Sequence, residues 1–429
     1  MIIFSQYSLG SKEWGVNLSA SGGLIKEVNV TEETGAVHKK RVISIDYLRG
    51  IVIVLMALDH IREFFTFGGF SPTDLSQTSA ALFFTRWVTH FCAPVFVFLA
   101  GTGAFLYKSR GRSKLELSRF LLTRGLFLIF LEFTVIRFAV TFNLNYFSPG
   151  STVAQVIWVL GISMVILSAV VFLSNWLIAL FGIGLIAAHN LFDAASVMPA
   201  FEWLWIVLHK PGLLMLPLGL EAKLIYPVVP WVGVMALGYM FGNIVTQEEE
   251  KRKKCFFWLG LGLVAAFIII RSINIYGDPV PWTSQGSFLF SVLSFLNCAK
   301  YPPSLLFLLM TLGPAILALS FFSEKDTPAS KFFVTFGRVS LFFYIIHFFL
   351  IHVIAIIFSM LRYNVMPHWL FANNPVFSSP SFPSGPTDYG YDLIAVYLIW
   401  IIVTLLLYPV CRWYMKYKAT HAYPWLSYL

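Results

Sequence analysis

Long apolar stretches, separated by short polar segments, recur along the chain from about residue 43 onward. Within them the hydrophobic positions are continuous rather than alternating every second residue, which favours helices over the strands of a membrane barrel. A helix needs about 20 mostly apolar residues to cross a bilayer. Ten stretches are predicted as membrane-spanning helices: 44–66, 82–107, 118–141, 152–173, 175–192, 225–246, 255–275, 303–322, 338–360 and 390–413.

The composition supports the same fold class. Hydrophobic residues make up 58% of the 429 residues and charged residues only 12%, whereas soluble domains carry about 25% charged residues. A soluble core could not bury this much apolar surface, and the 43 Phe and 13 Trp exclude a disordered chain. The sequence therefore predicts an all-α, polytopic integral membrane helical bundle.

The formal net charge of +9 is explained by topology. With both termini in the cytoplasm, most of the 30 Lys and Arg fall on cytoplasmic segments, as the positive-inside rule requires. The basic clusters lie at 39–41, 108–124, 251–254, 325–338 and 412–418. No nucleic-acid binding is therefore expected.

The connections predicted for the outer face are long and rich in aromatic residues and proline. They comprise 67–81, 192–224, 276–302 and 361–389. Loops of this length are often functional. Within the third of them, 287–297 is predicted as an interfacial helix.

Three segments are predicted. Residues 1–42 form a mobile cytoplasmic tail without a signal peptide, residues 43–415 form the transmembrane domain, and residues 416–429 form a short cytoplasmic tail. The four cysteines, at positions 92, 255, 298 and 411, show no CxxC spacing, so neither a disulfide framework nor a metal knuckle is predicted. No two histidines lie at i,i+4 with a carboxylate on one span, so no metal site is expected.

The first predicted span carries the most informative polar face. Asp46, Arg49 and His60 follow helical spacing along one face. Arg49 and His60 are eleven residues apart, so they differ by about 20° in direction and about 16 Å along the axis. Ionisable groups inside spans usually mark functional sites. The alternatives are that Asp46 and Arg49 form an i,i+3 pair that pins the helix at the interface, and that His60 is a core histidine satisfied by a neighbouring helix.

Asp59 precedes His60 directly but points about 100° away around the helix, because adjacent residues do not face each other. We therefore expect Asp59 to pair with Arg62 or with another helix rather than with His60.

On the second span, Arg86, His90 and Pro94 share one face at i,i+4 spacing. Pro94 lacks an N–H, so the carbonyl of His90 is released for another partner. These residues are interpreted as functional, and the alternative is a kinked helix with an interfacial arginine.

The remaining positions of interest in the spans differ in their expected roles. Glu132 and Arg137 on the third span are expected to form structural contacts, and Gly238 and Gly242 to permit close helix packing. On the ninth span, His347 lies nearer mid-membrane than the histidine at position 352 and is the stronger functional candidate of the two.

These residues resemble two known patterns. Arg49, ten intervening residues and His60 resemble the Arg-X10-His signature of integral-membrane acyltransferases that O-acylate sugars. More closely, a series of motifs over residues 41–415 is similar to a bacterial member of the heparan-α-glucosaminide N-acetyltransferase-like family. The motifs are Ser44-Ile-Asp46-x-x-Arg49-Gly50, Met56-x-x-Asp59-His60, Pro94-Val-Phe-Val-Phe-Leu-Ala-Gly101, Tyr226-Pro-Val-Val-Pro230-Trp-Val-Gly233 with Gly238, Lys300-Tyr-Pro-Pro-Ser304 and Gly337-Arg338-Val-Ser340-Leu.

The resemblance implies transfer of an acetyl group from cytoplasmic acetyl-CoA to a hydroxyl or amine of a glycan at the outer face of a bacterial cytoplasmic (inner) membrane. In the family's lysosomal member the active histidine follows the first span, whereas the corresponding loop here, 67–81, contains none. His60 is therefore the candidate catalytic base, assisted by Asp59, His90 and His347. The donor-binding candidates are Arg49, Asp46, Arg86 and Arg338.

A second function class is compatible with the same residues, namely a proton-coupled transporter or channel that uses the buried Asp, His and Arg groups. The sequence leaves open the identity of the acceptor, O- versus N-acylation, and direct transfer versus an acyl-enzyme. It also leaves open the oligomeric state, with a homodimer among the alternatives.

Overall fold

The computed structural model describes residues 42–66, 69–148, 150–324, 327–371, 385–386, 388–421, 423 and 426. The described elements belong to one unit, Arg41–Leu429. The predicted N-terminal tail except its last residue, the basic position Lys325 and part of the connection 361–389 lie outside the described residues.

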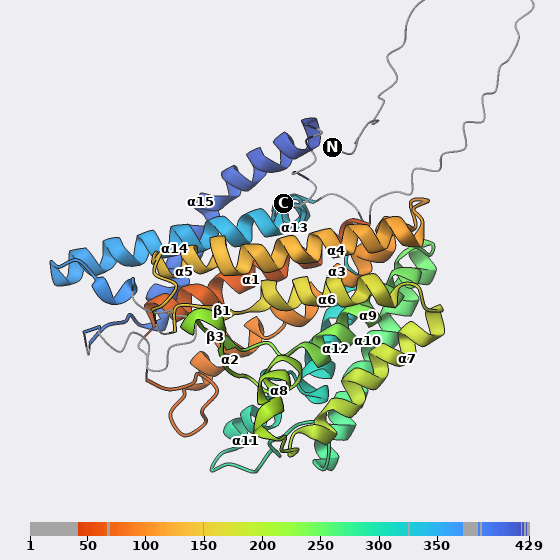
Figure 1. Ribbon diagram of the computed structural model, residues 1–429, viewed down its shortest axis with the longest axis horizontal. Helices are drawn as coiled ribbons and strands as arrows, with labels where there is room; N and C mark the ends of the chain where they lie inside the picture. Colours follow the sequence, from red (N-terminus) through yellow and green to blue (C-terminus); the bar gives the residue numbers. More distant parts are fainter. Residues whose placement is uncertain are drawn as a thin grey trace, which may run out of the picture. The chain divides into compact units, whose positions relative to one another are not determined.

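Each of the ten predicted spans corresponds to one helix or to consecutive helical pieces. They are α1 (Ile43–Phe65), α2 (Ala80–Thr89) with α3 (Cys92–Lys108), α4 (Lys114–Leu131) with η1 (Glu132–Ile136) and α5 (Arg137–Thr141), α6 (Val156–Val170), α7 (Asn175–Ala188), α9 (Val228–Val245), α10 (Glu249–Ile273), α12 (Leu305–Phe321), α14 (Ser340–Tyr363) and α15 (Leu393–Thr420). Figure 1 shows α7 and α10 along one flank and α14 and α15 on the other.

Shorter elements lie in the connections. They are α8 (Glu202–Leu208), α11 (Phe288–Leu296), α13 (Pro328–Arg338), β1 (Val153–Ala154), β2 (Gly212–Met215), β3 (Glu221–Leu224) and 3-10 turns at His189–Phe192, Pro199–Phe201, Pro217–Gly219 and His368–Leu370. The helix predicted for 287–297 is confirmed as α11, whereas α13 and the strands were not predicted. The predicted start of the span 152–173 is wrong, because Val153 and Ala154 form β1 and the helix begins at Val156.

Several helices are apolar on surfaces that face away from the rest of the chain. Six helical stretches among the described residues are long and apolar enough to cross a bilayer by length and composition. Three of these, including α7 and α10, bury less than a third of their apolar window, whereas α9 buries 72% of its own. Exposed apolar side chains such as Trp258 on α10 suit contact with lipid. The predicted all-α polytopic membrane bundle is confirmed.

Glycines set two close helix crossings. A Cβ placed on Gly238 of α9 would lie 2.0 Å from the carbonyl oxygen of Phe98 on α3. A Cβ on Gly50 of α1 would lie 1.8 Å from the carbonyl oxygen of Phe333 on α13. Because only glycine permits such approaches, the predicted packing role of Gly238 is confirmed, and α1 is held tightly against α13.

The second predicted span is interrupted. α2 ends at Thr89 and α3 begins at Cys92, in the turn that precedes Pro94, which cannot donate a backbone hydrogen bond. At the other end of the chain, α15 continues to Thr420, beyond the predicted end of the last span at 413, so the first part of the predicted C-terminal tail is helical.

A three-stranded sheet with the order β1-β3-β2 lies among the connections. β1 pairs in parallel with β3 through Val153 and Lys223, and β2 pairs with β3 in antiparallel fashion. Because parallel strands end at the same edge, Gln155 directly after β1 and Tyr226 shortly after β3 emerge side by side. Both line the cavity described below.

Candidate functional site

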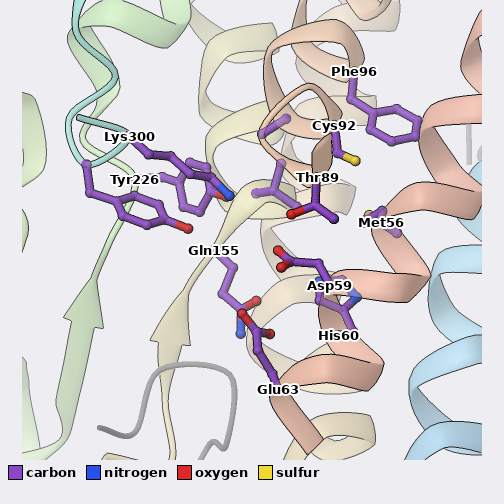
Figure 2. Close-up of a pocket in the computed structure, with 13 residues that line it drawn as sticks. Met56, Asp59, His60, Glu63, Thr89, Cys92, Phe96, Gln155, Tyr226 and Lys300 are labelled. Atoms are coloured by element: carbon purple, nitrogen blue, oxygen red, sulfur yellow. The ribbon is translucent and has the colours of Figure 1, made fainter. Parts of the chain in front are cut away.

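A narrow cavity of about 30 Å³ lies beside the second half of α1 (Figure 2). By volume it holds on the order of two water molecules. Its lining comes from α1, α2, α3, the end of β1, the residues after β3 and the segment before α12: Met56, Asp59, His60, Glu63, Thr89, Cys92, Ala93, Phe96, Gln155, Val156, Tyr226, Lys300 and Tyr301.

His60 is joined to His347 inside the bundle. The Nδ1 atom of His60 lies 2.8 Å from the Nε2 atom of His347 on α14, and His347 is fully buried. The Nδ1 atom of His347 lies 2.6 Å from the carbonyl oxygen of Tyr344 and 3.1 Å from that of Phe343. Both oxygens belong to the preceding turn of α14.

This arrangement fixes where the hydrogens sit. A carbonyl oxygen only accepts, so Nδ1 of His347 carries a hydrogen, and Nε2 of the neutral ring is then an acceptor. Nδ1 of His60 must therefore donate to it, which leaves Nε2 of His60 with a lone pair. Among the described residues Nε2 of His60 has no hydrogen-bond partner, and His60 lines the cavity. His60 therefore lines the cavity as a base whose Nε2 lone pair has no hydrogen-bond partner.

The carboxylate of Asp59 accepts hydrogen bonds from arginines and not from the imidazole of His60. Its Oδ1 accepts from Arg62 at 3.1 Å, and its Oδ2 accepts from Arg86 on α2. Both carboxylate oxygens are therefore committed to arginines, as the sequence predicted for Arg62 or a second helix. Glu63, one turn after Asp59, also accepts from Arg62, at 3.3 Å, through one of its oxygens.

The opposite wall of the cavity is aromatic and basic. Figure 2 shows Lys300 and Tyr226 reaching toward the helix that carries Asp59 and His60. The ring of Tyr226 contacts that of Tyr301 with centroids 5.2 Å apart and nearly perpendicular planes. Gln155 completes this wall with an amide group. The cavity therefore combines a base, hydrogen-bonding groups and a cation.

The other end of α1 gathers a second set of predicted residues. Asp46 lies 3.5 Å from the Nη1 of Arg49 and 3.6 Å from the Nε of Arg338 at the end of α13. Asp46 is buried, whereas the side chains of Arg49 and Arg338 are 23% and 37% exposed. A buried carboxylate thus holds two accessible guanidinium groups, and the predicted Asp46–Arg49 pair is confirmed as a contact.

Seven of the eight candidates from the sequence divide between two places. His60, Asp59 and His347 come together at the cavity, and Asp46, Arg49 and Arg338 come together at the start of α1. Arg86, predicted as a donor-binding residue, pairs with Asp59. His90 is buried against the ring of Phe307 and is not among the residues that line the cavity.

Other buried polar groups are structural, as expected. Arg137 donates to the carbonyl oxygens of Asn143 and Asn145 at 2.6 and 2.7 Å, which ties down the loop after α5. An oxygen of Glu132 accepts from the backbone N–H of Trp158 at 2.9 Å, in the first turn of α6. Within the described part of the chain, no three His, Cys, Asp or Glu side chains are grouped so as to hold a metal ion.

Sequence reasoning did not assign roles to several cavity residues. Glu63 could have been found, because it lies four residues after Asp59 on the same helical face. Tyr226, Tyr301 and Lys300 belong to motifs that carried the family resemblance, but they lie in connections, where no periodicity indicates which way a side chain points. Gln155 follows a strand that has only two residues and gives no sequence signal.

Comparison with known families identifies the family of the chain. The family model for heparan-alpha-glucosaminide N-acetyltransferase, catalytic, matches residues 41–276, which is more than half of the 429 residues. No curated protein matches the chain. The matched segment contains His60, Asp59 and Tyr226 and ends before Lys300 and His347. The chain therefore belongs to the heparan-α-glucosaminide N-acetyltransferase catalytic family and is a membrane acetyltransferase by family.

Proposed function

We propose that the protein transfers an acetyl group from cytoplasmic acetyl-CoA to a hydroxyl or amine of a sugar acceptor that arrives from the outer face, with His60 as the general base. The observation that carries this proposal is the hydrogen bond between His60 and His347, whose direction is set by two carbonyl oxygens. It gives the open nitrogen of His60 the lone pair that proton abstraction requires.

The reaction balances with this pair alone. The acceptor's oxygen or nitrogen attacks the thioester carbonyl carbon while its hydrogen passes to Nε2 of His60. The resulting imidazolium is held through its Nδ1–H by His347. When the tetrahedral intermediate collapses, the C–S bond breaks and the departing thiolate takes the proton from His60, so that free CoA and the acetylated acceptor are formed. His347 acts as a positioning residue, in the way that a third group orients the base in catalytic triads.

The proposed donor route starts at the other end of α1. Arg49 and Arg338 present partly exposed guanidinium groups there, and planar guanidinium groups bind phosphate in a bidentate manner. The distance of about 16 Å along α1 between Arg49 and His60 suits a donor whose anionic nucleotide and reactive thioester lie at opposite ends of a long arm. The basic cytoplasmic connections would attract such an anion.

The acceptor side is supported by the shape and lining of the cavity. A space that holds on the order of two waters admits an acetyl group and a single reacting hydroxyl or amine rather than a whole sugar. The side chains of Tyr226 and Tyr301 line the same cavity and contact each other through their rings. Tyrosine hydroxyl groups can hydrogen-bond the reacting hydroxyl or amine of the acceptor.

The proposal is tested with purified protein in detergent, given radiolabelled acetyl-CoA with amino sugars and neutral sugar glycosides. We expect acceptor-dependent transfer of label, and thermal stabilisation by acetyl-CoA. In sealed vesicles of uniform orientation, acetyl-CoA should be used only from the face that carries the basic connections.

Proton-coupled solute uptake without any effect of acetyl-CoA would instead support the transporter. Use of acetyl-CoA from the outer face alone would contradict the proposed route.

A further inference from the structure

Lys300 contributes a cation to the lining of the cavity, and the proposed proton transfer does not use this cation. It lies in the segment between α11 and α12 and lines the cavity together with His60. Within the described part of the chain its ammonium makes no hydrogen bond and no ion pair, and its one ring contact is a distance of 5.2 Å to the centroid of Tyr301. Figure 2 shows the side chain extended toward the α1 wall.

Among the described residues no carboxylate of the cavity forms an ion pair with this cation. Both oxygens of Asp59 accept from arginines. One oxygen of Glu63 accepts from Arg62, and its other oxygen is buried without a hydrogen-bond partner. Three cations, Arg62, Arg86 and Lys300, therefore face two carboxylates at or beside the cavity. A cation of this kind in a narrow, largely buried space favours the arrival or the formation of negative charge.

The backbone on both sides of Lys300 is held by one buried carboxylate. Asp278 accepts from the backbone N–H of Ala299 at 2.8 Å and from the hydroxyl of Ser304 at 2.6 Å. These residues flank the Lys300–Pro303 turn, in which residues 300 and 303 also form a β-bridge. The side chain of Asp278 is only 1% exposed. The position of Lys300 is therefore built into the fold rather than left to a free loop.

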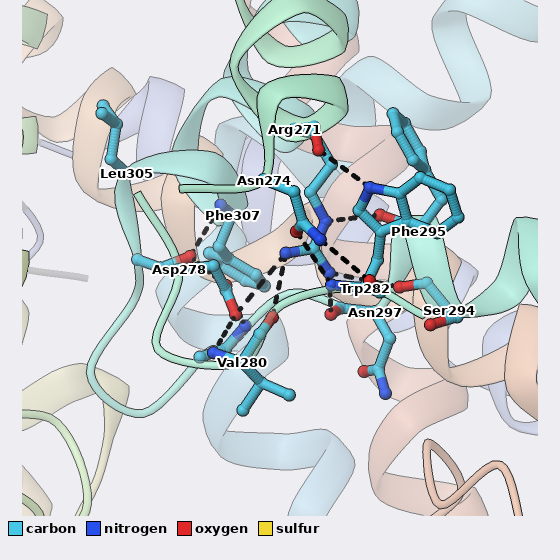
Figure 3. A network of polar contacts seen from close by, with 12 residues as sticks. Arg271, Asn274, Asp278, Val280, Trp282, Ser294, Phe295, Asn297, Leu305 and Phe307 are labelled. Carbon is cyan, nitrogen blue, oxygen red and sulfur yellow. Dashed lines mark hydrogen bonds and ion pairs between the residues drawn. The ribbon is translucent and has the colours of Figure 1, made fainter. Parts of the chain in front are cut away.

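A buried arginine anchors the same segment to α10 (Figure 3). Arg271 donates to the carbonyl oxygens of Val280, Phe295 and Asn297, each at 3.0 Å, and to that of Ser294 at 3.2 Å. It also lies 3.9 Å from Asp278. Because one fully buried side chain holds residues from 278 to 297, the approach to Lys300 is rigid, as preorganised charge stabilisation requires.

We infer that Lys300 is the group that stabilises the oxyanion when the acceptor attacks the thioester of acetyl-CoA, an inference that rests on the proposed function. As the new bond to the carbonyl carbon forms, the electron pair of the C=O bond moves onto oxygen, and the Lys300 ammonium neutralises this charge from the wall opposite His60. When the intermediate collapses, the pair returns to the carbonyl and the C–S bond breaks. Lys300 neither gains nor loses a proton in the sequence.

The test compares Lys300→Met, which keeps the length of the side chain without its charge, with Lys300→Arg. Removal of one oxyanion donor costs about 10²–10³ in kcat, so Lys300→Met should lose that factor while KM for acetyl-CoA and for the acceptor change by less than about threefold. Lys300→Arg should recover part of the loss. Lys210→Met serves as the matched control, because Lys210 is an exposed lysine in another connection, and it should keep wild-type kcat.

Unfolding temperature and stabilisation by acetyl-CoA show that each variant is folded, and Lys300→Gln replaces Lys300→Met if the latter does not accumulate. If Lys300→Met keeps more than about a third of wild-type kcat, or raises only the acceptor KM, Lys300 is not the oxyanion group and the inference is overturned. Failure of the proposed function would be seen separately, as an absence of acetyl-CoA-dependent transfer in the wild-type protein.

Discussion

The most informative perturbation is His347→Leu, because it removes the acceptor that fixes the tautomer of His60 and leaves His60 itself in place. In the wild-type protein, Nδ1 of His60 donates to Nε2 of His347 at 2.8 Å, in a fully buried contact. Leucine fills most of the same space but cannot accept. The imidazole of His60 is then free to carry its hydrogen on Nε2, the position that must be bare for proton abstraction.

The magnitude follows from two separate terms. A buried donor left without its acceptor costs about 1–3 kcal/mol of stability, so the unfolding temperature should fall by a few degrees. General-base assistance is worth about 10²–10⁴ in rate, and a wrongly oriented or wrongly protonated base loses much of it. We expect kcat of His347→Leu to fall by at least about 10²-fold with the acetyl-CoA KM within about threefold. His347→Gln, whose amide oxygen can accept, should recover part of the rate.

The chain offers a matched control on the same helix. His352 is also buried on α14 and donates through its Nδ1–H to the carbonyl oxygen of Ala139, 3.2 Å away, but it does not line the cavity. His352→Leu should therefore cost a similar amount of stability with little loss of acetyl transfer. Rates are measured as acceptor-dependent release of CoA thiol in detergent, with unfolding followed in parallel. If His347→Leu keeps more than about a tenth of wild-type kcat while folded, the orienting role of His347 is refuted.

Two further predictions concern the start of α1. Arg49→Ala should weaken acetyl-CoA binding by about tenfold to a hundredfold, because charge-assisted hydrogen bonds contribute about 1.5–3 kcal/mol. Arg49→Lys should restore only part of this affinity, since lysine cannot form the bidentate contact. Unchanged affinity in a calorimetric titration, together with lower stability, would show that Arg49 only partners Asp46. Gly50→Ala places a Cβ 1.8 Å from the carbonyl oxygen of Phe333 and should destabilise the protein by about 1–3 kcal/mol or more. In the control Gly103→Ala, the added Cβ meets nothing within 4 Å, so the unfolding temperature should not fall. Equal unfolding temperatures for both variants would contradict the close α1–α13 crossing.

Much of the fold could be predicted because the bilayer imposes a length and a composition on each helix. The same pattern could not show where helices break. The interruption between α2 and α3 lies inside one apolar stretch, and α13 is too short and too polar to be recognised as part of the bundle. The strands have two to four residues, which is too short for an alternation of polar and apolar residues to identify them.

Part of the candidate site could likewise be predicted from the sequence and part could not. The polar face of α1 follows from helical periodicity, and so does the separation of Asp59 from His60. The contact between His60 and His347 spans 287 residues of sequence and depends on how α1 packs against α14, which periodicity within one helix does not specify. Lys300 was visible only as part of a motif, because it lies in a connection whose backbone is held by Asp278, which in turn lies 3.9 Å from Arg271 on α10.

The central claim, that His60 is the base, is tested most directly by acetyl transfer in His60→Ala. The variant is purified, shown to unfold at a temperature close to that of the wild-type protein and shown to bind acetyl-CoA, and its acceptor-dependent rate is then measured. We predict a loss of at least about 10²-fold and up to about 10⁴-fold in kcat with donor affinity retained. A folded, donor-binding His60→Ala variant that keeps more than about a tenth of the wild-type rate would contradict the claim, and the base would then have to be sought at His347 or His90.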